Sequence, residues 1–489
     1  MRLLNTETYQ LHTFPSADIT PPYAILSHCW DATGEVTFAD IQHLPRARTM
    51  SGWSKVENAC AVALQKHQCE WLWMDTCCID KGSSAELSEA INSMFAWYLR
   101  SKICLAYLND VPTCENIVER IRHMRASRWF TRGWTLQELI APAQDVVFLS
   151  EDWVKLGTRC DLASFLADLT QIDRGVLVES GGRQDWHLAR LRAISVAERM
   201  SWAAGRDTTR PEDKAYSLMG LFDVNMPVLY GEGADKAFRR LQQEIIRDSF
   251  DHSIFAWGVR SPSSDFPPWP YYQPMVKHAH SDKLVCRISW SHGALLASSP
   301  DDFRYSAGLK GESLVKLTDA LRLSDIGEPH FYPTNYGIRI QLPLCFLGAR
   351  DSWQLYHALL ACSTLSDPDA RIGLLLLRIP GTDVYYCMNI SDLEARSSEV
   401  RSRAVEHSKL SLQSRRPIFP SAWKLSTIYI RDYVPVPSAP LWTNGYLNPT
   451  AYQRTSPRGI ERPRPPSPYL FANLPRGMLS RLASKLWFK

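Results

Sequence analysis

The sequence predicts an α/β protein, with a parallel sheet and flanking helices first, then a helical subdomain and then a mainly β domain. Three observations lead to this prediction. Over residues 1–150, short apolar segments alternate with longer ones in which apolar residues recur every three or four positions, the pattern of a parallel sheet with helical crossovers. Over residues 151–260, the periodicity is helical. Over residues 285–433, short segments alternate apolar and polar residues between turns, as half-buried strands do.

Two apolar segments of the first domain end in clusters of polar residues. Residues 23–30 pass from an apolar stretch into Ser27 and His28, and residues 70–80 pass from an apolar, aromatic stretch into Asp75. A short apolar run bounded by polar residues predicts a buried strand. A short strand is also expected within residues 1–19. Two further strands are expected at the ranges 103–108 and 145–149.

Helices are expected between these strands. Residues 54–67 carry apolar side chains on one helical face. Ser83 and Glu86 have the spacing of a capping box and start a helix over 87–99. Another helix is expected within 128–140, where Pro142 ends it.

The later part of the chain changes character twice. In the helical region, Leu191, Ile194, Ala197 and Met200 form one periodic set. A Pro/Ser-rich segment at 261–270 marks a boundary, after which strands are expected at 336–342, 373–379, 384–390 and 426–430. Residues 434–473 are rich in Pro, Ser and Arg and are expected to be extended or disordered. The tail 434–489 is expected to end in a short basic amphipathic helix. Weak contact of this helix with an anionic membrane surface is one interpretation, and a solvated or partner-packed tail is the favoured one.

Composition excludes several classes of function. The chain has 489 residues, 45% of them hydrophobic and 22% charged, as in soluble globular proteins. Neither a signal peptide nor an apolar run of about 18 residues is present, so a cytoplasmic location is expected. The net charge is +4, but residues 434–489 alone carry +7 (eight basic residues and one acid). The body therefore carries −3, and no nucleic-acid partner is expected. The 12 cysteines include no Cys-x-x-Cys pair and are expected to be mainly small buried hydrophobes.

The polar clusters of the first domain are expected to meet in one pocket. Parallel strands place their carboxyl ends at the same edge of the sheet, so Ser27, Trp30 and Asp75 are predicted to lie near Glu138. Trp134 precedes Glu138 by four residues and is expected on the same helical face. This set fits glycosidic-bond chemistry on a nucleotide. Glu138 would face positive charge developing at a sugar carbon, Trp30 or Trp134 would stack on the base, and Ser27 and Asp75 would hold hydroxyls.

Other interpretations of the same residues remain open. A carboxylate on a tryptophan-bearing helix is more often solvated or salt-bridged than catalytic. A thiol hydrolase could use Cys77 or Cys78 with His28 as its base, although buried structural cysteines are commoner. A zinc site from His28, Cys29, Cys77 and Cys78 is disfavoured because adjacent cysteines lack the usual ligand spacing, so no metal is expected. The Gly231-Glu232-Gly233 segment is expected to be a turn rather than a phosphate loop.

Three ordered blocks and the helical region after them resemble the fungal HET (heterokaryon incompatibility) domain proteins over about residues 1–258. The blocks are Tyr23-Ala24-Ile25-Leu26-Ser27-His28-Cys29-Trp30, Leu72-Trp73-Met74-Asp75-Thr76-Cys77-Cys78-Ile79-Asp80 and Arg132-Gly133-Trp134-Thr135-Leu136-Gln137-Glu138-Leu139. The family often has Gly where this chain has Asp31.

The resemblance implies both a fold and a function. It implies a flavodoxin/TIR-like parallel sheet with its core at about 23–140, in a protein of non-self recognition and regulated cell death. Some TIR domains hydrolyse NAD with a helical glutamate, which by position is Glu138 here, with Ser27, His28, Trp30, Asp75, Cys77 and Trp134 around it. NAD would be a substrate, and no cofactor is expected. The alternative is a non-catalytic death-signalling module that acts by self-association, either as a homo-oligomer or with other incompatibility proteins.

Overall fold

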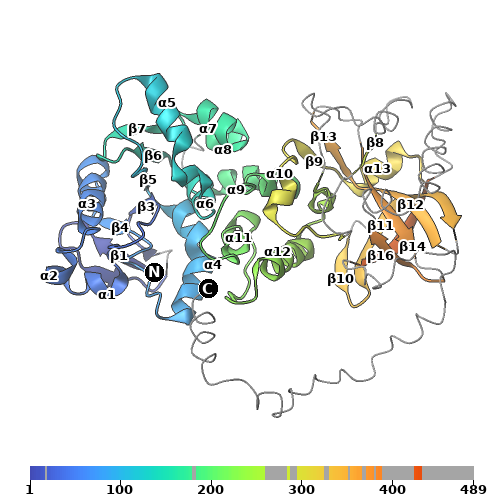
Figure 1. Ribbon diagram of the computed structural model, residues 1–489, viewed down its shortest axis with the longest axis horizontal. Coiled ribbons are helices and arrows are strands. Elements are labelled where there is room, and N and C mark those ends of the chain that lie inside the picture. The colour runs from blue at the N-terminus through green and yellow to red at the C-terminus, as the bar shows by residue number, and fades with distance from the viewer. Residues whose placement is uncertain are drawn as a thin grey trace, which may run out of the picture. The chain divides into compact units, whose positions relative to one another are not determined.

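A computed structural model of the chain (Figure 1) describes most of the first 435 residues. The described residues are 1–16, 19–178, 183–258, 284–286, 294–323, 330–350, 353–365, 371–378, 381–387 and 423–431. Residues Met1–Pro435 form one compact unit. The predicted boundaries at 150, 260 and 285 fall within this unit and stay predictions. The predicted tail and its basic helix lie outside the described residues.

The first 160 residues build a seven-stranded sheet whose four central strands are parallel. Its strands are β1 (Arg2–Asn5), β2 (Leu11–Thr13), β3 (Ala24–His28), β4 (Trp71–Trp73), β5 (Ile103–Tyr107), β6 (Val146–Leu149) and β7 (Lys155–Thr158). The order across the sheet is β2-β1-β4-β3-β5-β6-β7. The strands β3, β4, β5 and β6 pair in parallel, while β1, β2 and β7 add antiparallel edges. The predicted α/β class is confirmed, although the edge strand β7 was not predicted.

The helices of this region are α1 (Phe38–Ile41), α2 (Leu44–Ala47), α3 (Trp53–His67), α4 (Ser84–Arg100), α5 (Ile117–Ala126), η2 (Arg128–Thr131) and α6 (Thr135–Ile140). Crossovers between parallel strands are right-handed. Across the sheet, the connection from β3 to β4 runs one way, whereas the connections from β4 to β5 and from β5 to β6 run the other way. The helix α3 of the first connection therefore lies on one face of the sheet, and α4 and α6 of the later connections lie on the other. As a result, α6 packs against both β3 and α4.

Two local details differ from the sequence-based expectation. The predicted capping box of α4 is only half formed. The Ser83 side chain accepts from the Glu86 backbone N–H, but the Glu86 carboxylate binds the backbone N–H of Asp80 and the Arg2 guanidinium instead. The predicted helix within 128–140 is broken into η2 and α6, because Arg132 adopts extended backbone angles.

The helical region contains α7 (Ala163–Thr170), α8 (Arg174–Leu177), α9 (Gln184–Arg192), α10 (Val196–Ser201), α11 (Asp213–Tyr216), η3 (Gly220–Phe222), α12 (Ala234–Asp248) and η4 (His252–Phe255). The periodic set from Leu191 to Met200 does not form one helix, because Ser195 starts α10 afresh. Its hydroxyl accepts from the Glu198 N–H and donates to the Leu309 carbonyl, 2.6 Å away.

The described residues beyond 284 are mainly strands. They form β8 (Leu284–Cys286), β9 (Leu309–Gly311), β10 (Tyr332–Thr334), β11 (Gly337–Arg350), β12 (Trp353–Leu359), β13 (Cys362–Thr364), β14 (Arg371–Arg378), β15 (Val384–Cys387) and β16 (Trp423–Arg431), with η6 (Pro300–Phe303) and α13 (Leu314–Ala320). The four strands expected from sequence alternation correspond to β11, β14, β15 and β16. Their sheet has the order β10-β11-β12-β14-β15-β16, with β11 also paired to β16 and β8 to β14.

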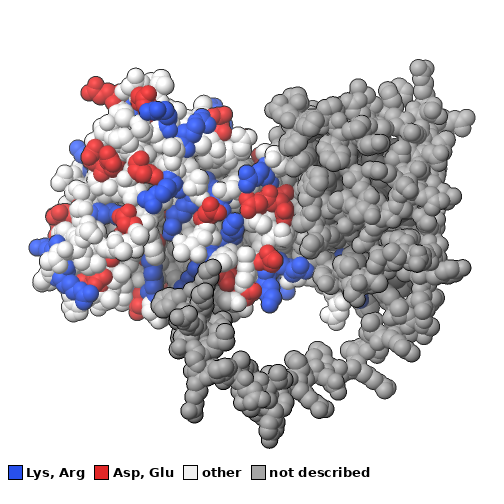
Figure 2. Space-filling model, viewed as in Figure 1, with Lys and Arg blue, Asp and Glu red and all other residues white. Residues whose placement is uncertain are grey.

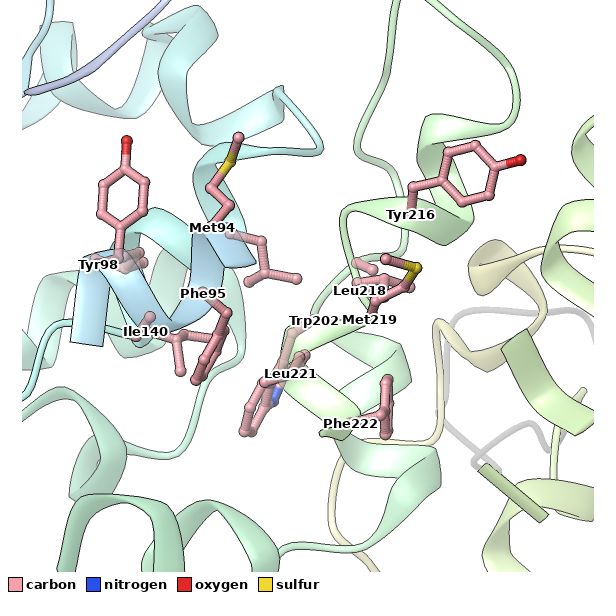
Figure 3. Close-up of a cluster of buried hydrophobic side chains, with 14 of the residues drawn as sticks. Met94, Phe95, Tyr98, Ile140, Trp202, Tyr216, Leu218, Met219, Leu221 and Phe222 are labelled. Carbon is pink, nitrogen blue, oxygen red and sulfur yellow. The ribbon is translucent and has the colours of Figure 1, made fainter. Parts of the chain in front are cut away.

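A buried apolar cluster joins the parallel-sheet region to the helical region. In Figure 3, Phe95 of α4 lies beside Trp202, and Leu218, Met219 and Leu221 follow on the side of η3. Gly220 lets η3 approach α4 closely, since a Cβ there would lie 2.1 Å from the Phe95 Cβ. The two regions therefore share one core, and burial of this kind supplies most of the stability of a fold.

On the face seen in Figure 2, basic and acidic side chains are interspersed over the described residues. No helix within the described ranges is both long and apolar enough to cross a bilayer.

Candidate functional site

A buried carboxylate and a buried hydroxyl meet at the carboxyl end of the parallel sheet. The Ser27 hydroxyl of β3 donates a hydrogen bond to the Glu138 carboxylate of α6, and the Trp129 indole N–H donates to the Ser27 oxygen at 2.8 Å. Ser27 is fully buried and Glu138 is 7% exposed. The pair forms because α6 packs on β3 from the face that it shares with α4. The predicted proximity of Ser27 and Glu138 is therefore found in the structure.

The environment of Glu138 makes its carboxyl group titrate near neutrality. Burial raises its pKa to about 7, and the negative charge of Asp75 adds to this effect. The hydrogen bond from Ser27 and the positive charge of Arg132 oppose the rise. A carboxyl group with such a pKa is present in both charge states at pH 7. It can therefore act as an acid, as a base or as a counter-charge.

A second group of polar side chains lies around Asp75, just beyond β4. The Asp75 carboxylate lies 3.0 Å from Nε2 of the buried His28, and the Trp30 indole N–H donates to it at 2.9 Å. Burial would raise the pKa of Asp75, but the Lys81 ammonium, the His28 hydrogen bond and the Arg132 charge together hold it well below its usual range. Asp75 is thus a fixed negative charge at this edge of the sheet.

Two of the predicted site residues take no part in this arrangement. The Trp134 indole N–H donates to the Asp213 carboxylate of α11 at 3.2 Å, whereas Glu138 faces Ser27. Trp134 is the N-cap of the short helix α6 rather than a residue within it. Cys77 is fully buried, and its sulfur faces the Met74 carbonyl at 4.0 Å. The structure therefore brings together Ser27, His28, Trp30, Asp75 and Glu138, and leaves Trp134 and Cys77 aside.

The thiols near this edge are poor nucleophiles at neutral pH. A hydrogen bond with Cys78 and burial raise the pKa of Cys77 well above its ordinary value, and burial raises that of Cys29 to about 11. Because the thiolate is the reactive form, these groups are inert at pH 7. Among the described residues, no three His, Cys, Asp or Glu side chains are placed to hold a metal ion.

We expect thiol labelling to separate these buried cysteines from an exposed one. Iodoacetamide at pH 7 should alkylate the exposed Cys160 and leave Cys77 and Cys78 unmodified in the native protein. Peptide mass spectrometry with and without denaturant measures the pattern. Alkylation of Cys77 at the rate of Cys160 would revive the thiol-hydrolase interpretation.

Residues from the helical region hold the start of α6, which sequence reasoning did not anticipate. The Arg206 guanidinium donates to the Arg132 carbonyl at 3.0 Å and to the Thr135 hydroxyl at 3.3 Å. The Asp207 backbone pairs with the chain on either side of Arg132. Arg206 is 5% exposed, and burial lowers its pKa to about 10. A single arginine between two helical segments gives no local signal of this role.

The Gly231-Glu232-Gly233 segment is a turn, as expected. Its two glycines have positive φ angles, and their backbone N–H groups donate to one oxygen of the Glu212 carboxylate at 2.9 and 3.0 Å. The anion that these backbone groups bind is thus a side chain of the same chain.

Comparison with known proteins finds two family models that match parts of this chain. Residues 23–118 match the family model described as heterokaryon incompatibility protein (HET), in agreement with the resemblance found in the sequence. Residues 236–433 match a domain of unknown function, DUF8212. The match to HET contains Ser27, His28, Trp30 and Asp75, while Glu138 lies beyond it.

A curated relative extends the likeness beyond that range. The vegetative incompatibility protein HET-E-1 of Podospora anserina is 43% identical to this chain over 239 residues. That alignment covers 48% of this chain and 17% of the relative, so the chain matches about one sixth of the relative's length. No solved structure matches the chain.

Proposed function

We propose that this protein acts in heterokaryon incompatibility, in the cytoplasm of a fungal cell, by cleaving the N-glycosidic bond of NAD at Glu138. The family match and the likeness to HET-E-1 support the incompatibility role. The order of the parallel strands, β4-β3-β5-β6 with helices on both faces, supports the further proposal of a TIR-like fold. The buried Glu138 carboxyl, which titrates near pH 7 beside Ser27, is the observation that carries the enzymatic proposal.

The reaction needs little more than a well-placed carboxylate. As the bond between the ribose carbon and the pyridinium nitrogen breaks, its electron pair leaves with neutral nicotinamide, and positive charge develops on the ribose. Ionised Glu138 stabilises that charge, and the Ser27 hydroxyl orients the carboxylate. Water then attacks the ribose carbon and releases a proton, so that NAD and water yield ADP-ribose, nicotinamide and H⁺.

We expect purified protein to release nicotinamide from NAD, and Glu138→Gln to lower this rate at least about 100-fold. The wild-type rate should rise with pH through a midpoint near 7, because the ionised form of Glu138 is the active one. Exposed Glu70→Gln serves as the matched control and should keep full activity. Absence of nicotinamide release at high protein concentration contradicts the enzymatic proposal.

A second candidate function is a death-signalling module that works by self-association or with other incompatibility proteins. One observation favours it: the Glu138 carboxylate already has a partner within the protein, as expected of a buried structural group. Expression in a fungal host separates the two functions. Toxicity that persists in Glu138→Gln supports the association module, and toxicity that is lost supports the enzyme.

A further inference from the structure

Two cations share one half-exposed indole at the edge of the sheet where Glu138 lies. The Lys81 ammonium lies 3.3 Å from the centre of the Trp30 ring, and the Arg132 guanidinium carbon lies 5.8 Å from the same centre. The two positive charges are therefore no more than about 9 Å apart, close enough to repel each other appreciably. Trp30 is 36% exposed, so this group faces solvent.

Neither cation has an acidic partner within salt-bridge distance among the described residues, unlike the nearby Lys55. The Lys55 ammonium binds both Asp31 and Glu35. The acid on which both cations act electrostatically is Asp75, and its oxygens are already held by His28 and the Trp30 indole N–H. Nε of Arg132 is buried and has no hydrogen-bond partner in the described part of the chain. A buried donor of this kind costs free energy unless a partner binds it.

The position of these groups in the fold is where ligands bind in open α/β sheets. Trp30 and Lys81 follow the carboxyl ends of β3 and β4, and the chain leaves β3 and β5 in opposite directions across the sheet. The crevice beyond such a switch of direction is the usual ligand site. Aromatic contacts hold the two cations in place before any ligand arrives, which lowers the entropy lost on binding.

We propose that Lys81 and Arg132, assembled on Trp30, bind a phosphate group. The substrate of the proposed reaction would supply that group as the pyrophosphate of a dinucleotide, and in this respect the inference rests on the proposed function. Arginine and lysine are the usual phosphate ligands, and a doubly charged anion would relieve the repulsion between the two cations. The negative charge of Asp75 repels a bound anion, so the phosphate is expected to bind on the side of Lys81 and Arg132 that faces away from Asp75.

Binding is tested separately from turnover by using the Glu138→Gln protein, which leaves any nucleotide intact. Isothermal titration calorimetry measures the affinity of this protein for three ligands, namely ADP-ribose, inorganic pyrophosphate and adenosine. We expect ADP-ribose and pyrophosphate to bind and adenosine to bind at least about 10-fold more weakly, since it lacks phosphate. Affinity should fall as salt concentration rises. Pyrophosphate binding without ADP-ribose binding supports the site and identifies inorganic pyrophosphate, rather than a dinucleotide, as its ligand.

Variants of the two cations then test whether Lys81 and Arg132 form the binding site. In the same background, Lys81→Met and Arg132→Gln should each weaken ADP-ribose binding about 10-fold or more, whereas exposed Lys66→Gln on α3 should leave it unchanged. Circular dichroism confirms that each variant is folded. Unchanged affinity in Lys81→Met and Arg132→Gln, or equal binding of adenosine, overturns the proposal. ADP-ribose binding that depends on both cations, in a protein that never cleaves NAD, supports this site and contradicts only the proposed reaction.

Discussion

Glu138→Gln is expected to remove a pH-dependent loss of stability of about 2.5 kcal/mol between pH 5 and pH 8. Glu138 has a pKa of about 7 in the folded protein, against an ordinary value of 4.5. Between these two values the unfolded chain has released the proton while the folded protein keeps it, so the free energy of unfolding falls as pH rises. The difference of about 2.5 pKa units corresponds to about 3.4 kcal/mol between low pH and pH above 7, and about 2.5 kcal/mol of this is lost between pH 5 and pH 8.

Glutamine keeps an oxygen that accepts the Ser27 hydrogen bond but carries no charge at any pH. The contributions of all other titrating groups therefore cancel when the wild type is compared with Glu138→Gln. Urea unfolding of both proteins at pH 5 and pH 8 gives the four free energies needed. Relative to the wild type, the free energy of unfolding of the variant should gain about 2.5 kcal/mol on going from pH 5 to pH 8. Glu70→Gln should show no such gain. A pH-independent difference between wild type and Glu138→Gln would mean that Glu138 does not titrate near neutrality.

Gly220→Ala is expected to destabilise the protein by about 3 kcal/mol, because there is no room for a methyl group where η3 meets α4. The added Cβ would lie 2.1 Å from the Phe95 Cβ and 2.6 Å from its Cγ. The Phe95 Cβ is attached to the backbone of α4 and cannot rotate away, so η3 and α4 must separate. That movement opens the apolar cluster of Figure 3, which includes Tyr98. The Tyr98 hydroxyl donates to the Leu26 carbonyl, next to Ser27.

The matched control is Gly82→Ala in the loop after β4. There the nearest atom to the added Cβ is an oxygen of the Asp80 side chain at 3.1 Å, which can move aside. Its cost should stay below about 1 kcal/mol. Urea midpoints of the two variants measure the difference. Equal midpoints would show that α4 and η3 are not as closely packed as the structure has them.

Several site residues could be predicted because each follows an apolar strand directly in the chain. Ser27 and His28 end β3, Trp30 comes just after it, and Asp75 comes just after β4. A run of apolar residues that stops at polar ones is visible without a fold, and parallel strands then bring their carboxyl ends to one edge. Glu138 needed the family resemblance as well, because a glutamate in a short helix is usually solvent-exposed.

Sequence thus determined the α/β class, the strands that carry the site and the identity of most polar residues at its edge. Tertiary packing decided the rest. The pKa of Glu138 depends on burial against β3, and its partner Ser27 is 111 positions away in the chain. Arg206 reaches the start of α6 from the helical region, and Trp134 turns toward Asp213 instead of the site. Local periodicity records which face of an element is apolar, whereas these contacts depend on which elements pack together and how deeply each side chain is buried.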